Sequence, residues 1–252
     1  MTINIPKQTH RVYMERSLVI GQDRYEAGQI YTVDAERFNR LTTPNEDEKT
    51  PAASKVYFPS LDAIEQSVDY AVDTYKKQRD DLKNHPRFDD APSMRTYELQ
   101  QLRKELDKQV AELRDRYEIE IQAIQRETAD KMYTLQASED TSYLNVASTQ
   151  LQFGNPVTTL QSLLLKADQV DEAGKLAILQ SFSDIADKAK SHKHYSYYKI
   201  DIEKKLDELY EIASNVPTIR ENERRLQQLD ELYKHKSGVD SSYRMLNITE
   251  KV

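Results

Sequence analysis

The apolar positions between residues 94 and 139 form the most regular pattern in the chain. This stretch contains neither Gly nor Pro, and its apolar side chains recur in steps of three, four and four residues. An 11-residue repeat keeps its apolar side chains on one side of a nearly straight helix, so the pattern predicts a single long helix of roughly 70 Å. The predicted packing stripe consists of Leu99, Leu102, Leu106, Val110, Leu113, Tyr117, Ile121, Ile124, Met132 and Leu135.

The opposite face of this predicted helix is charged, with side chains such as Arg103 and Glu112. A helix with one apolar side must bury that side against another element. Residues 60–83 carry a second amphipathic pattern, and residues 84–93, which contain two prolines, separate the two stretches. Because a short joint makes consecutive helices neighbours, we expect a long antiparallel hairpin over residues 60–139. Pairing of the stripe between two copies of the chain is the alternative.

The remaining patterns predict smaller elements, so the expected fold class is mainly α. Two β-rich runs separated by a Gly-bounded turn predict a hairpin near the N-terminus, followed by a short helix that Asp34 caps. Several short amphipathic stripes near the C-terminus predict a small helical bundle. The expected segments are a hairpin and helix module (1–41), a linker with an extended anchor (42–59), the long helical hairpin (60–139), a connector (140–155), the bundle (156–236) and a tail (237–252).

Composition and charge narrow the functional classes. Only 38% of the residues are hydrophobic, 31% are charged, and the chain has just 5 Gly and 8 Pro, which favours extended helices over a compact α/β enzyme. The net charge of −7 argues against a general nucleic-acid coat. The absence of Cys excludes disulfides and thiolate chemistry and fits a reducing cytoplasm. We expect no signal peptide and no transmembrane segment, because no long apolar run is present.

No sequence motif points to catalysis. The glycines never form a phosphate-binding loop, and no nucleophile lies near a candidate base. His192 and His194 are two residues apart and lack a third metal ligand at helical spacing. The carboxylates lie on charged helix faces beside Lys and Arg, where solvation explains them better than acid and base catalysis. We therefore expect no catalytic residue, no cofactor and no metal site.

One basic and aromatic cluster stands out between residues 188 and 199, which read KAKSHKHYSYYK. Lysines beside tyrosines can contact phosphates and stack on bases. The alternative is a turn between helices, where lysines favour the negative end of the preceding helix. A nucleic-acid contact here would be an accessory one. The lysines of the cluster are Lys188, Lys190, Lys193 and Lys199.

Residues 11–41 combine a short strand motif with a capped helix. The motif contains Tyr25, Ala27 and Gly28 in the order Y-x-A-G, then Ile30 and Val33, and an Asp-led helix with Arg37 and Leu41. This order resembles a small module of tailed-phage head-gene proteins, in which a variable tail follows. The resemblance covers about an eighth of the chain. It implies a virion or virion-assembly protein, located in the virion after assembly in the host cytoplasm.

These observations together predict a non-enzymatic structural protein of a tailed-phage particle, in the head or head-tail region. Its partners would be capsid, portal or other virion subunits, and we expect a homo-oligomer or multiple copies and no membrane contact. A capsid scaffolding or assembly protein is the close alternative. A cytosolic helical adaptor or regulator that binds other proteins is the second. The residues expected to dock on partners are Tyr25, Ile30, Tyr31, Val56, Tyr57 and Phe58.

Overall fold

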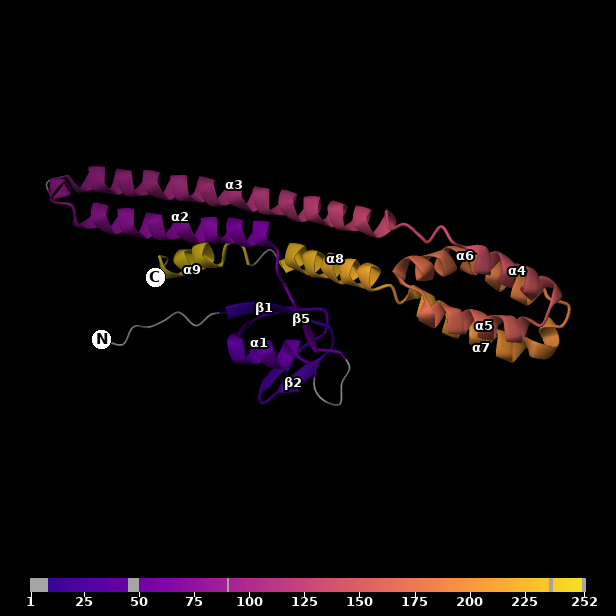
Figure 1. The fold of residues 1–252 in the computed structure, drawn as a ribbon. Coiled ribbons are helices and arrows are strands. Elements are labelled where there is room, and N and C mark those ends of the chain that lie inside the picture. Colours follow the sequence, from indigo (N-terminus) through magenta and orange to yellow (C-terminus); the bar gives the residue numbers. More distant parts are fainter. Residues whose placement is uncertain (1–8, 45–49, 90, 236–237, 251–252) are drawn as a thin grey trace. The chain divides into compact units, whose positions relative to one another are not determined.

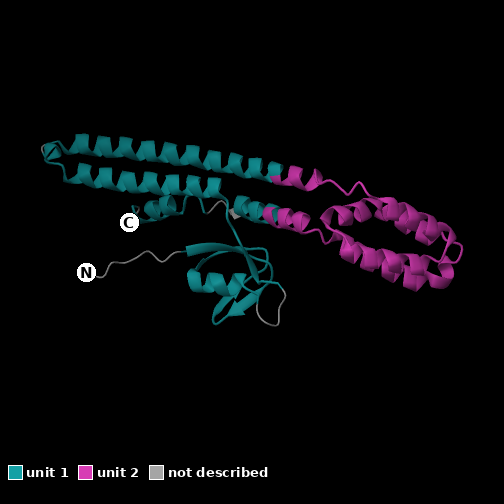
Figure 2. Ribbon diagram, in the orientation of Figure 1, with its two compact units in different colours: residues 1–127, 226–252 teal, residues 128–225 magenta. Residues whose placement is uncertain are grey.

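A computed structural model describes residues 9–44, 50–89, 91–235 and 238–250. The chain divides into two compact units, drawn in teal and magenta in Figure 2. The first unit contains residues 1–127 and 226–252, and the second contains residues 128–225. Each unit has its own hydrophobic core. The predicted fold class, mainly α with a small antiparallel sheet near the N-terminus, is confirmed.

A small antiparallel sheet belongs to the first unit. Its strand order is β4-β1-β5, and β1 pairs with both neighbours, so that Tyr13 lies opposite Ile30 on one side and Ser54 on the other. A second hairpin, β2 with β3, turns at Gly21, whose φ of +65° favours glycine. The strands are β1 (Thr9–Met14), β2 (Leu18–Ile20), β3 (Asp23–Tyr25), β4 (Ile30–Asp34) and β5 (Ala53–Lys55).

The short helix α1 (Ala35–Thr42) follows β4 directly. Its predicted cap is confirmed, because the Asp34 carboxylate accepts a hydrogen bond from the backbone N–H of Arg37 at 2.9 Å. The segment 42–59, which was expected to be a linker with an extended anchor, contains strand β5 of the sheet. Pairing with β1 makes this part of the segment a component of the N-terminal module, so the expected end of the module at residue 41 needs correction, whereas residues 45–49 of the expected linker lie outside the described residues.

The long hairpin is formed by α2 (Pro59–Asn84) and α3 (Pro92–Tyr133). Figure 1 shows α2 beside the first part of α3 in the first unit. Between them lies η1 (Pro86–Phe88), where Phe88 is buried and Arg87 lies over its ring. The five central stripe residues of α3 share a buried core with six side chains of α2. These residues are Leu106, Val110, Leu113, Tyr117 and Ile121 of α3, and Leu61, Ile64, Val68, Ala71, Val72 and Tyr75 of α2.

The stripe therefore packs within one chain over its central part. Leu102 and Ile124 are partly buried against the same core, and Leu99 is half-buried. The predicted stripe is wrong at its far end, because α3 ends at Tyr133 and Leu135 lies beyond it. Met132 and Leu135 are half-buried residues of the second unit.

The C-terminal part of the first unit is helical. The last part of α8 (Pro217–His235) contributes Leu229 and Leu232 to the core of the hairpin. Residues 237–252 were expected to form a tail. The structure instead contains helix α9 (Ser241–Thr249), whose Leu246 is buried in the same core.

The second unit is a helical bundle that is built mainly from α4 to α7. In the bundle, α7 packs against α5 and α6, and α4 packs against α5 and α6. Residues 140–155, expected to be a connector, contain α4, and Leu144, Ala147 and Leu151 of that helix are core residues. The helices are α4 (Ser142–Phe153), α5 (Pro156–Gln169), α6 (Glu172–Ser191) and α7 (Tyr195–Ser214), followed by the first part of α8.

Candidate functional site

The expected docking residues are largely interior. Tyr25, Val56 and Phe58 are buried in the cores of the first unit, so the docking prediction is wrong for these three. Their apolar side chains stabilise the chain's own fold. Ile30 and Tyr31 are partly buried against the same cores.

Tyr57 is the remaining residue of the predicted docking set, and its side chain is 55% exposed. The Lys55 ammonium lies 4.6 Å from the centre of its ring, a favourable cation–π contact. Strand geometry explains the difference between Tyr57 and its neighbours, because successive side chains of an extended segment point to opposite sides. Val56 and Phe58 are buried, whereas Lys55 and Tyr57 are exposed.

A half-buried group of ion pairs joins the sheet to the long hairpin. Arg11 of β1 donates to the carboxylates of Asp62 and Glu65 at the start of α2, with 2.7 Å between its Nη1 and Glu65 Oε1. The hydroxyl of Tyr117 on α3 donates to the same Glu65 oxygen at 3.1 Å. Burial and the Glu65 charge raise the pKa of Tyr117. The N-terminal module is thus bonded directly to α2, and Glu65 links it in turn to Tyr117 of α3.

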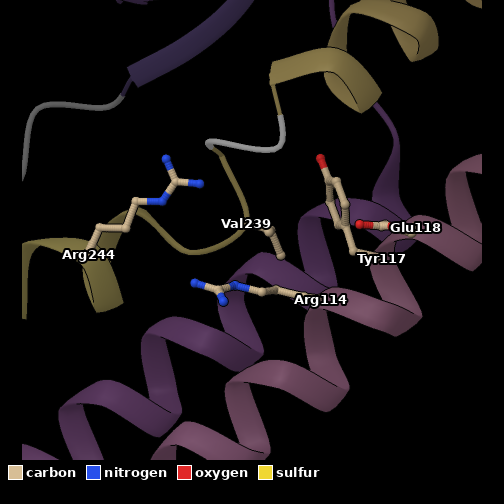
Figure 3. A pocket seen from close by; sticks show the side chains of 5 residues that line it. All are labelled: Arg114, Tyr117, Glu118, Val239 and Arg244. Atoms are coloured by element: carbon tan, nitrogen blue, oxygen red, sulfur yellow. The ribbon is translucent and has the colours of Figure 1, made fainter. Parts of the chain in front are cut away.

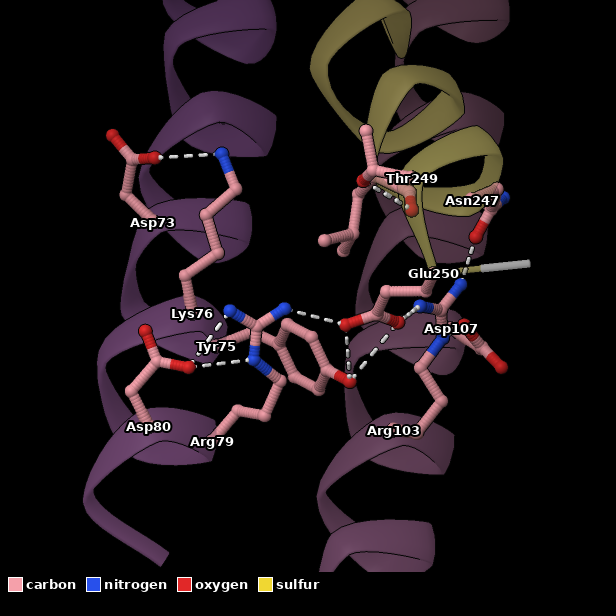
Figure 4. A network of polar contacts seen from close by, with 11 residues as sticks. Asp73, Tyr75, Lys76, Arg79, Asp80, Arg103, Asp107, Asn247, Thr249 and Glu250 are labelled. Atoms are coloured by element: carbon pink, nitrogen blue, oxygen red, sulfur yellow. Dashed lines mark hydrogen bonds and ion pairs between the residues drawn. The ribbon is translucent and has the colours of Figure 1, made fainter. Parts of the chain in front are cut away.

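The C-terminal helix is held across the hairpin by a second polar network, shown in Figure 4. The Glu250 carboxylate accepts from Arg79 of α2 at 2.7 Å and from Arg103 of α3 at 2.6 Å. The Tyr75 hydroxyl lies 3.2 Å from Glu250 Oε1, and burial raises the pKa of Tyr75. Arg103 also donates to Asn247 of α9. We call Glu250, Asn247 and their partners Arg79, Arg103 and Tyr75 the C-terminal clasp.

Just before the first residue of α9, a nearly enclosed carboxylate makes a related contact. Asp240 is 1% exposed and pairs with Arg114 of α3 and, at 2.9 Å, with Arg244. Both arginines line a pocket of about 220 Å³ beside Tyr117 and Val239, shown in Figure 3. Because both arginines already pair with Asp240 and the acidic Glu118 lines the same pocket, the pocket is better explained as part of the α9 packing than as an anion site.

The basic cluster lies at the end of α6 and the start of α7 in the second unit. Lys188 is bonded to Asp184 at 2.7 Å and to the Ser148 hydroxyl of α4. Lys199 lies 4.0 Å from Glu203, at the limit of an ion pair. Lys190 and Lys193 are exposed. The cluster thus contains two lysines that lie near a carboxylate, Lys188 and Lys199, and two exposed lysines, Lys190 and Lys193.

A pocket of about 370 Å³ brings part of this cluster against the end of α4. The sequence predicted the basic cluster that contains His192 but not its approach to Phe153, because Phe153 was assigned to a connector. Phe153 is 76% exposed, which is unusual for so large an apolar ring, and this exposure follows only from the position of α4. The pocket is lined by Gln152, Phe153, Lys188, Ser191, His192 and Lys193.

His192 is the buried polar side chain of this pocket, with 6% exposure. Its Nδ1 accepts a hydrogen bond from the backbone N–H of His194 at 3.2 Å. In the neutral ring the proton therefore lies on Nε2. This Nε2 atom is buried and has no hydrogen-bond partner among the described residues. The pocket is thus lined by a side chain whose ring N–H lacks an acceptor.

Two other kinds of site were examined over the described parts of the chain. No group of three or more His, Cys, Asp or Glu side chains is arranged there to hold a metal ion. Within the same residues, no helix combines the length and the apolar character that crossing a bilayer requires.

Comparisons with protein-family models, with curated proteins and with solved structures found no match to this chain.

Proposed function

We propose that this chain is a non-enzymatic structural protein of a tailed-phage particle, in the head or head-tail region, and that it docks on and links other virion subunits. The resemblance of residues 11–41 to a module of phage head-gene proteins supports the virion context. The observation that carries the linking role is the joint made by Arg11, Glu65 and Tyr117.

This joint fixes the N-terminal module to the long hairpin. Arg11 contributes from the sheet, Glu65 from α2 and Tyr117 from α3. Charge-assisted hydrogen bonds with little solvent access are stronger and more directional than surface ion pairs. A module fixed in this way can transmit its position to the helices, as a linking subunit requires.

The docking surface that supports the proposal is the exposed Tyr57 with Lys55. Tyrosine is enriched at protein interfaces, because its ring buries apolar area while its hydroxyl stays hydrogen-bonded. Tyr57 lies between β5 and α2, next to the residues that hold the module to the hairpin. A partner that binds here would contact the module and the hairpin together.

The adaptor alternative requires the long helix to pair with a second copy through its stripe. The five central stripe residues are buried against α2 and α9 within the chain. A second copy would have to displace those contacts, so this mode of dimerisation is disfavoured. Capsid scaffolding stays a variant of the proposed function, and the experiment below separates the two.

Mass spectrometry of particles purified from the phage that encodes this chain tests the proposal. Finding the chain in both proheads and mature virions would support a structural subunit. Finding it in proheads but not in mature virions would replace that role with scaffolding. Its absence from both kinds of particle would refute the virion proposal. Deletion of the gene, with assembly followed by electron microscopy, provides an independent readout of the same question.

A further inference from the structure

The pocket at the ends of α4 and α6 contains features that helix capping does not explain. Both helices end at the pocket, α4 at Phe153 and α6 at Ser191, and cations are favoured at helix C-termini. This accounts for Lys188, which is already bonded to Asp184 and Ser148. It accounts neither for the unpartnered donor of His192 nor for the exposed ring of Phe153.

The unpartnered donor calls for an oxygen acceptor. Buried polar atoms without a hydrogen bond are costly, and a ligand that supplies the acceptor removes that cost. Lys193 lines the same pocket and makes no ion pair with another described residue. An acceptor that also carries negative charge therefore fits this pocket better than a neutral one.

The ring of Phe153 adds a planar apolar surface beside these polar groups. Aromatic side chains next to lysines are the usual arrangement for binding single-stranded nucleic acid, where bases stack and phosphates pair with cations. Residues 188–200 contain no Asp or Glu, so this end of the bundle is locally basic although the whole chain carries a net charge of −7. An acidic peptide would satisfy the donor and the lysine but would leave the ring unused.

We propose that this pocket binds one nucleotide of single-stranded nucleic acid, with the phosphate against the side chains of His192 and Lys193 and the base stacked on Phe153. This site is independent of the proposed structural role, because its ligand and its residues are different. The overall negative charge opposes nucleic acid at a distance, so the contact is local and sensitive to salt.

Fluorescence anisotropy of the full chain with a labelled oligothymidylate, measured over a series of salt concentrations, tests the proposal. Phe153→Leu keeps an apolar side chain but removes the ring, and we expect it to weaken binding about 5-fold or more. Lys193→Gln should lower the salt slope by about 0.7 for one lost phosphate contact. Both residues are exposed, so neither change should unfold the bundle.

The matched controls are Tyr70→Leu on α2, an exposed ring in the first unit, and Lys204→Gln on α7, an exposed lysine 3.9 Å from Glu208. Each should leave both the affinity and the salt slope unchanged. The proposal is overturned if the parent chain does not bind the oligonucleotide. It is also overturned if Phe153→Leu and Lys193→Gln bind as well as the controls do.

Three further ligands separate the possible sources of the anion. Inorganic phosphate, duplex DNA and a Glu-rich peptide are added as competitors to the same complex. We expect weak competition from phosphate and little from duplex DNA, whose bases are already stacked. Displacement by the peptide at a lower concentration than by unlabelled oligothymidylate would overturn the proposal in favour of a protein ligand. In ¹⁵N-labelled chain, the His192 Nε2 resonance should shift with thymidine monophosphate, and an unchanged resonance would refute the assigned donor.

Discussion

Arg103 on α3 holds Glu250, the residue that follows α9, with 2.6 Å between Arg103 Nη1 and Glu250 Oε2. The two residues are 147 positions apart in the chain. Arg79 on α2 binds the other oxygen of the same carboxylate at 2.7 Å. One carboxylate therefore bridges the two helices of the hairpin, and this polar contact adds to the packing of Leu246 of α9 in their shared core.

Replacing the bridging carboxylate tests this relationship. Glu250→Gln should lower the free energy of unfolding by about 1–2 kcal/mol, because Arg79 and Arg103 lose their shared counter-charge while remaining mostly shielded from water. Urea denaturation followed by circular dichroism measures the loss, and amide hydrogen exchange should become faster in α9. Glu112→Gln is the control, because Glu112 is largely exposed and lies 3.9 Å from Lys108. An equal effect of both changes would mean that the clasp adds nothing specific.

Two isoleucines on α3 test which face of the helix packs in the core. Ile121 is 1% exposed and belongs to the core shared with α2, whereas Ile119 is 66% exposed. Ile121→Ala should cost about 2–5 kcal/mol because it opens a cavity in that core. Ile119→Ala should change stability by less than about 0.5 kcal/mol. Urea denaturation of both variants checks the difference, and similar losses would contradict the packing of the stripe against α2.

The regular part of the fold follows from the sequence because its causes are local. The steps between Leu106 and Ile121 specify one face of a helix whatever the rest of the chain does. Asp34 caps α1 through a hydrogen bond to a residue three positions away. Patterns of this kind need no knowledge of distant contacts, and both predictions were confirmed.

The C-terminal helix depends on distant contacts, which explains why it was expected to be a tail. Residues 241–249 read SSYRMLNIT and include Ser, Asn and Thr, which are weak helix formers in isolation. Leu246 is buried only because α2 and α3 are present, and Arg103 reaches Asn247 from a different part of the chain. Tertiary packing stabilises this helix where local propensity does not.

The candidate sites also combine features that the local sequence predicts with features that depend on distant contacts. The lysines between residues 188 and 199 can be recognised from the sequence, because they lie close together there. The approach of Phe153 to Lys193 and His192 depends on how α4 packs against α6, which no local pattern encodes. The docking prediction was wrong for Val56 and Phe58, because a short apolar segment has the same sequence pattern whether it packs against a partner or in the chain's own core.

The cap of α6 provides a test of the second unit. The Asp171 carboxylate accepts from the backbone N–H of Gly174 at 2.9 Å. Asp171→Ala should destabilise the bundle by about 1 kcal/mol, whereas Asp171→Asn should retain most of the stability because Asn also caps helices. Thermal denaturation and hydrogen exchange in the first turn of α6 measure the effect. Asp168→Ala, at an exposed position of α5, is the control, and a loss as large as that of Asp171→Ala would argue against capping.

Alkaline pH should weaken the joint between the N-terminal module and the hairpin. Burial raises the pKa of Tyr117 above its ordinary value of 10.0, so the folded state keeps the hydroxyl proton longer than the unfolded state does. The stabilising contribution is complete below the unfolded pKa and is lost as pH rises through the folded pKa. Tyr117→Phe should therefore show a smaller fall in stability above that unfolded value. Urea titrations at a series of alkaline pH values measure the slope, and identical slopes for the parent and the variant would contradict this assignment.

Tyr57 offers a test of the proposed docking that does not disturb the fold. Because its ring is mostly outside the core, Tyr57→Ala should leave the free energy of unfolding nearly unchanged. If Tyr57 binds a virion subunit, the variant should be incorporated into particles at a level reduced about tenfold, as expected for an aromatic interface residue whose loss costs more than 1 kcal/mol. Tyr70→Ala, another exposed tyrosine, is the matched control. Quantitative mass spectrometry of particles from cells that express each variant gives the result, and equal incorporation of both variants would exclude Tyr57 from the docking surface.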